Sequence, residues 1–112
     1  MDAEVPDLAV AFTGYLAERR LSANTRESYR RDVESFLAYL AGTGGQSPLT
    51  VDSATIARYL ESLKEQGRSP STVARRLASL RAFYRFLDRQ RLVEADPTER
   101  TPAPRAERQT PA

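Results

Sequence analysis

Apolar residues recur every three or four positions in four stretches of this chain, and no stretch shows the alternation typical of a half-buried strand. The four stretches span residues 6–20, 22–42, 50–67 and 69–90. At the start of the fourth, Ser69 can accept a hydrogen bond from an unpaired backbone amide, and the ring of Pro70 already fixes a helical φ. Four amphipathic helices joined by short turns predict an all-α bundle.

Polar residues at the ends of the other stretches also predict helix boundaries. Ser22 is a candidate N-cap for the second helix, and Gly42 ends its apolar pattern. Thr50 or Asp52 caps the third helix, and Gly67 follows its last apolar residue. These signals place each helix start independently of the apolar periodicity.

The chain from residue 96 onward differs in composition from the rest. The sequence DPTERTPAPRAERQTPA is rich in proline and polar residues and has almost no apolar side chain to bury. It predicts a disordered or extended C-terminal tail. Since 112 residues are too few for two ordinary domains, we expect one domain over residues 1–95 and a linker over residues 96–112.

The composition excludes several kinds of chemistry. The chain has no cysteine and no histidine, so it cannot form a disulfide or a thiolate metal site and lacks the commonest general base. We therefore expect no cofactor and no metal. No apolar run approaches the roughly 20 residues that span a bilayer, and the N-terminus is acidic where a signal peptide would be basic, which favours a cytoplasmic location without a membrane partner.

Positive charge is concentrated in one part of the chain. Between Arg68 and Arg91 there are seven arginines and one acidic residue, Asp88, whereas the remainder of the chain is net acidic. Such asymmetry predicts one basic face directed at a polyanion.

Two predicted helices carry polar rows on the side opposite their apolar stripes. The row on the second helix consists of Asn24, Ser28 and Arg31, and the row on the fourth consists of Thr72, Arg75 and Ser79. Arginine together with small hydroxyl and amide groups suits contacts with phosphates and base edges. Ordinary solvated surface is the simpler interpretation, but the near-absence of acids on the fourth helix favours DNA contact. Phe86, expected on the exposed side of this helix, is a candidate contact for another domain or subunit.

Two segments resemble a known family. LSANTRESYRRDVESFLAYL and SPSTVARRLASLRAFYRFL, followed by DPT, are similar to the N-terminal core-binding domain of tyrosine recombinases, the Xer and phage-integrase family. The resemblance covers residues 6–98. Its pattern consists of Thr25, Tyr29, Asp32 and Phe36 on the second helix, and Ser71, Thr72, Leu77, Leu80, Phe83 and Leu87 on the fourth.

The resemblance implies a SAM-like four-helix bundle that forms half of a C-shaped clamp on a duplex recombination site. Its second and fourth helices would enter the major groove, and other recombinase subunits would be partners of the full-length protein. The implied DNA contacts are Asn24, Ser28, Arg31, Ser71, Thr72, Arg75 and Ser79, with Arg76 at the rim toward a phosphate.

The chain departs from the family pattern in two ways. The usual Asn-Pro after the fourth helix is Asp96-Pro97, a mild change because both residues tolerate the turn before a proline. The second departure is that none of the family's catalytic residues, a tyrosine with arginines, a lysine and histidines, can be located. The resemblance therefore implies a fragment or truncated product that does not cleave strands alone.

Two alternatives remain open at this stage. The first is a helical protein-interaction module whose basic helix docks on an acidic partner and whose binding depends on Phe86. The second is a stand-alone helix-turn-helix regulator formed by the third and fourth helices, in which the second helix, and therefore Arg31, would not touch DNA.

Overall fold

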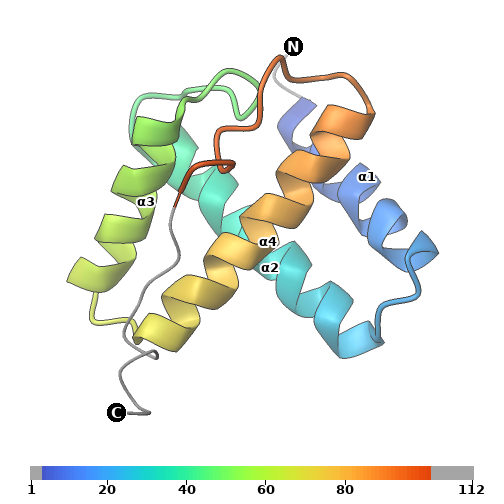
Figure 1. Cartoon of the computed structure of the whole chain (residues 1–112), viewed down its shortest axis with the longest axis horizontal. Helices are drawn as coiled ribbons and strands as arrows, with labels where there is room; N and C mark the ends of the chain where they lie inside the picture. Colours follow the sequence, from blue (N-terminus) through green and yellow to red (C-terminus); the bar gives the residue numbers. More distant parts are fainter. Residues whose placement is uncertain (1–3, 102–112) are drawn as a thin grey trace.

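The structure, a computed structural model, describes residues 4–101, with side chains from residue 8 onward. In this part of the chain α1 spans Glu4–Glu18, α2 spans Ala23–Gly42, α3 spans Ser53–Glu65 and α4 spans Pro70–Arg89. No strand occurs among the described residues, and the predicted all-α fold is confirmed. α2 and α4 cross at the centre of the bundle, with α3 and α1 on opposite sides (Figure 1).

Side-chain caps define the starts of three helices. Ser22, Asp52 and Ser69 each accept a hydrogen bond from the backbone amide three residues later, at 3.1, 3.0 and 3.2 Å. Asp52, rather than Thr50, caps α3. The hydrogen bonds from Thr55 hold the pKa of the Asp52 carboxyl below its usual value. None of the four helices is long and apolar enough to cross a membrane, as far as the described residues go.

Aromatic rings fill the centre of the bundle. Phe12 of α1 meets Phe83 of α4 edge to face, with ring centroids 5.4 Å apart, and Phe36 of α2 meets Tyr84 of α4 at 6.3 Å. The buried Tyr84 hydroxyl donates a 2.6 Å hydrogen bond to the carbonyl of Pro48. This bond ties the loop between α2 and α3 to α4, and burial raises the pKa of the Tyr84 phenol.

The expected exposure of Phe86 is wrong. Its side chain is only 5% exposed, and its ring lies 5.9 Å from that of Phe12 and 5.1 Å from that of Tyr15, measured between centroids. The C-terminal half of α4 therefore has a second buried side, because α1 covers the face that carries Phe86. Phe86 is a core residue of this domain rather than a contact to another.

The chain after α4 folds back onto the bundle. Asp96 accepts hydrogen bonds from the backbone amide and the hydroxyl of Thr98, at 2.8 and 2.6 Å, and Thr98 is fully buried. Thr101 is also buried, and its carbonyl accepts a hydrogen bond from Arg81. The expectation that the tail has almost nothing to bury is thus wrong for residues 96–101, where polar groups satisfy one another. The tail expected over residues 102–112 lies outside the described residues.

Candidate nucleic-acid interface

The first turns of α2 and α4 both lie on the lower side of the bundle in Figure 1, α2 at the right and α4 at the left of the point where the two helices cross. Neither helix has an acidic residue in its first turn. Each capping serine satisfies one of the free backbone amides, and the remaining amides and the positive ends of both helix dipoles lie on this side. The arrangement favours negative charge near both N-termini.

Most of the predicted contact residues on the first halves of α2 and α4 are accessible. Asn24, Arg31, Ser71 and Arg75 are exposed, and Ser28 and Thr72 are partly exposed. The Arg31 side chain is 71% exposed and lies 3.3 Å from Glu27. Such an exposed pair contributes little in water, so Arg31 can exchange this partner for a phosphate. Arg30 holds the pKa of Glu27 below its usual value.

The predicted position of Ser79 on the solvent face is wrong. Ser79 is fully buried, and its hydroxyl donates a 2.7 Å hydrogen bond to Oδ2 of Asp32 on α2. It cannot contact DNA in this arrangement. α2 crosses α4 at Ser79 and covers this position of the polar row, and the small serine side chain fits between the two helices.

Arg75 shares the same carboxylate. Its Nη2 donates a 2.9 Å hydrogen bond to Oδ1 of Asp32, while 47% of its side chain remains exposed. Asp32 itself is only 3% exposed. Arg75 is therefore tethered at Nη2 of its guanidinium, and about half of its side chain remains accessible to solvent.

Arg76 points into the protein rather than to the rim of a DNA site. Its side chain is 13% exposed, its Nη1 donates a 3.0 Å hydrogen bond to the Tyr59 hydroxyl, and its Nε lies 3.6 Å from Oδ1 of Asp32. Burial raises the pKa of the Tyr59 phenol, an effect that the nearby Arg76 guanidinium opposes. The expected outward role of Arg76 is wrong, since it joins α4 to α3 and α2.

The charge asymmetry of the sequence predicts one basic face on α4, but two of its arginines pair with an acid from another helix. Arg75 and Arg76 share one carboxylate, so a single net positive charge remains in that cluster. Arg81 donates to a neutral carbonyl, and Arg85 and Arg89 form no ion pair with a carboxylate of residues 8–101. Asp32 thus neutralises only one of the positive charges of α4.

Sequence reasoning named Asp32 only as part of the family pattern and missed its buried role. The signal was present, because Asp32 lies next to Val33 and four residues before Phe36, on the edge of the apolar stripe. An acid in such a position needs a partner from another element.

A hollow between α1, α2 and α4 is basic. It encloses about 330 Å³ and is lined by Arg19, Arg81 and Arg85, with no carboxylate in its lining. The Arg19 guanidinium lies 5.4 Å from the centroid of the Tyr15 ring, a cation–π distance that leaves its charge uncompensated. The positive charge of this surface is therefore available to an anion.

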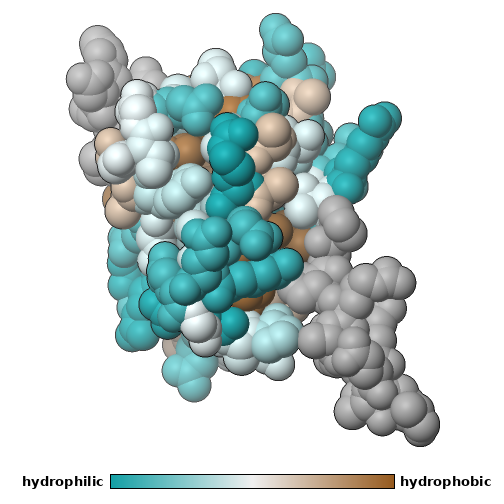
Figure 2. Space-filling model, turned by 90° about the vertical axis from the view of Figure 1, so that its left-hand side faces the viewer, coloured by the Kyte–Doolittle hydropathy of each residue, from teal (hydrophilic) through white to brown (hydrophobic). Residues whose placement is uncertain are grey.

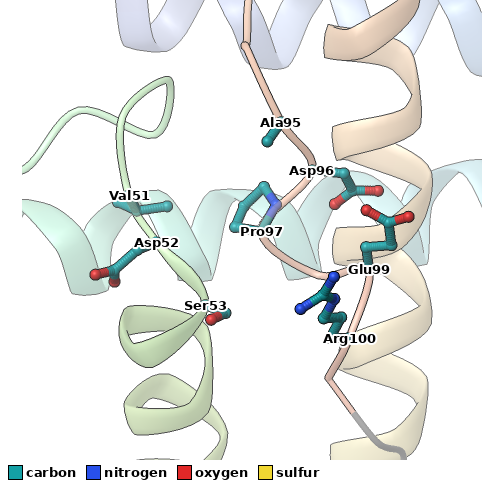
Figure 3. Close-up of a pocket in the computed structure, with 8 residues that line it drawn as sticks. All are labelled: Val51, Asp52, Ser53, Ala95, Asp96, Pro97, Glu99 and Arg100. Carbon is teal, nitrogen blue, oxygen red and sulfur yellow. The ribbon is translucent and has the colours of Figure 1, made fainter.

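A second hollow, beside the start of α3, has the opposite character. It encloses about 370 Å³ and is lined by Asp52, Asp96 and Glu99, with Arg100 as its cation (Figure 3). This excess of carboxylates is unsuited to a phosphate backbone. The described residues contain no group of three or more histidine, cysteine or acidic side chains placed to hold a metal ion.

Residues 9–91 match the model of the phage integrase N-terminal SAM-like domain family. The chain belongs to this family. It is 43% identical over 93 residues to the putative tyrosine recombinase TTE1313 of Caldanaerobacter subterraneus subsp. tengcongensis, covering 83% of this chain and 32% of that protein. It is 40% identical over 102 residues to the tyrosine recombinase XerC of Roseiflexus castenholzii, covering 90% of this chain and 32% of that protein.

A third relative is the tyrosine recombinase XerD of Halalkalibacterium halodurans, which is 38% identical over 95 residues, covering 84% of this chain and 32% of that protein. The chain thus spans about a third of the length of the curated relatives that it matches. Solved structures gave no significant match. The chain therefore contains a SAM-like domain of the phage integrase N-terminal family, over residues 9–91.

Proposed function

We propose that this domain binds duplex DNA at a recombination site and positions a tyrosine recombinase there, without cleaving DNA itself. The first halves of α2 and α4 form the contact surface, and strand cleavage belongs to residues outside this chain. The protein acts in the cytoplasm together with other recombinase subunits.

The observation that carries the proposal is that α2 and α4 both begin on the lower side of the bundle in Figure 1 and have no acidic residue in their first turns. Asn24 and Arg31 on the first half of α2, and Ser71 and Arg75 on the first half of α4, are exposed. Arginine and small polar groups on helices of this kind suit the major groove and the phosphates that flank it. The basic hollow lined by Arg85 adds positive charge with no carboxylate beside it.

The protein-interaction alternative is weakened by the position of Phe86, which that alternative needs at the surface and which is buried. The α3 side of the molecule, which faces the viewer in Figure 2, shows mainly hydrophilic residues with small hydrophobic areas between them. Nothing on that visible side suggests a large apolar docking site.

The salt dependence of binding tests the proposal. Fluorescence anisotropy with a labelled duplex selected from a random pool should give a log–log slope of affinity against salt of about −4 to −5, as expected for roughly five phosphate contacts. A slope near zero on every duplex would refute DNA binding.

Arg31→Ala separates the proposal from the helix-turn-helix alternative. If α2 contacts DNA, this variant should lower affinity on all duplexes and reduce the salt slope by about 1. In a helix-turn-helix built from α3 and α4 it should have no effect. Arg58→Ala is the matched control, because Arg58 is an exposed arginine of α3, outside the proposed surface.

A further inference from the structure

Asp32 joins the two helices of the proposed surface. Its carboxylate accepts one hydrogen bond from Ser79 at Oδ2 and one from Arg75 at Oδ1, across 47 and 43 positions of sequence. A carboxylate that is only 3% exposed must recover its lost hydration from such partners. Asp32 is therefore bound on both oxygens to α4, at the point where α2 crosses it.

The geometry around Arg75 points to a further role. Asp32 engages Nη2 alone, and among the described residues no hydrogen-bond acceptor is bound to Nε or Nη1 of Arg75. A guanidinium has five N–H donors in a fixed plane. Because 47% of this side chain is exposed, fixing Nη2 leaves the other donors of the same plane available to a ligand.

We infer that Asp32 is a positioning residue for DNA recognition, which holds Arg75 in the orientation that reads a base edge or a phosphate. This inference rests on the proposed DNA binding. An arginine ordered before binding loses less conformational freedom when DNA arrives. Removing the tether should therefore weaken selective binding by about threefold to tenfold.

The direction in which Asp32→Asn changes the affinity for DNA distinguishes a positioning role from simple electrostatics. Asp32 carries a negative charge near a surface that binds a polyanion, so simple electrostatics predicts that Asp32→Asn tightens binding to every duplex. Positioning predicts the reverse for the preferred duplex. The amide introduced by this substitution is neutral and holds the guanidinium less firmly, so affinity for the selected duplex should fall and the ratio of selected to shuffled affinity should shrink.

The experiment measures both affinities by fluorescence anisotropy, with the duplex selected by the wild-type chain and a shuffled duplex of the same composition. Glu34→Gln is the matched control, because Glu34 is an exposed acid on the same helix that bonds only Arg30. It should tighten binding to both duplexes slightly and leave their ratio unchanged.

A double-mutant cycle shows whether Asp32 acts through Arg75. In the Arg75→Ala background, Asp32→Asn should no longer reduce the ratio of selected to shuffled affinity. An effect of the same size in both backgrounds would indicate general damage to the fold and would overturn the inference.

The outcomes separate the two proposals. If the wild-type chain shows no salt-dependent binding to any duplex, the proposed function fails and the role of Asp32 fails with it. If the wild type binds but Asp32→Asn tightens both duplexes as Glu34→Gln does, the proposed function stands and the positioning role is refuted.

A second variant keeps the inference testable if Asp32→Asn does not fold, which circular dichroism would show. Ser79→Ala removes one donor to the carboxylate and keeps its charge, so the hold on Arg75 loosens without a change in net charge. A reduced ratio of selected to shuffled affinity supports the inference, and an unchanged ratio overturns it.

Discussion

Replacing Phe86 by alanine tests the packing of α1 against α4. The Phe86 ring is only 5% exposed and lies close to the rings of Phe12 and Tyr15, so truncation removes almost the whole side chain from the core and leaves a cavity between the two helices. Truncation of a buried phenylalanine costs about 3–5 kcal/mol. At an exposed helix position the same substitution would change the free energy of unfolding by no more than about 0.5 kcal/mol.

Urea unfolding followed by circular dichroism measures this cost. A small domain has a free energy of unfolding of about 5–15 kcal/mol, so a loss of about 3–5 kcal/mol should lower the urea midpoint clearly and the melting temperature by roughly 10 °C or more. Val10→Ala is the control, because Val10 lies on α1, the helix that covers Phe86, but is 72% exposed, and the free energy of unfolding of this variant should stay close to that of the wild type. If both variants lose the same small amount, α1 does not cover Phe86 and the described packing is wrong.

Three further predictions concern hydrogen bonds and ionisation. Tyr84→Phe should lower the free energy of unfolding by about 1–3 kcal/mol, since the buried carbonyl of Pro48 loses its donor; an unchanged urea midpoint would contradict this. The pKa of Tyr84 is raised in the folded protein, so the neutral phenol contributes fully to folding stability below about pH 10, and this contribution is lost as the pH rises further because the unfolded chain ionises first. Urea midpoints measured at increasing alkaline pH should therefore fall, and an unchanged midpoint would contradict this. Asp96→Ala should speed hydrogen exchange of the Thr98 amide, and equal protection in both proteins would show that this bond does not hold the segment.

Helix starts were predictable because their determinants are local. Ser69 and Pro70 lie next to the amides that they serve, and the capping bonds span only three residues. The apolar stripes likewise required no knowledge of the partner helices. The fold class and the four helices therefore followed from the sequence.

The candidate site was predictable only in part, because two of its features depend on contacts between distant residues. Ser79 lies in line with Thr72 and Arg75 on a helical wheel, and only the crossing of α2 decides that it is buried against Asp32. Periodicity identifies the side opposite the main stripe, but it does not show when another helix covers that side, as α1 covers Phe86. Whether a polar row is exposed thus depends on the packing of the other helices.

The bond between Arg81 and the carbonyl of Thr101 fixes where the chain leaves the domain. α4 itself ends at Arg89. Eight helical residues separate these two positions, which is a distance of about 12 Å along the helix axis at roughly 1.5 Å per residue. The segment after α4 therefore runs back along the helix by about two turns, and it restrains the polypeptide at the middle of α4 as well as at its end.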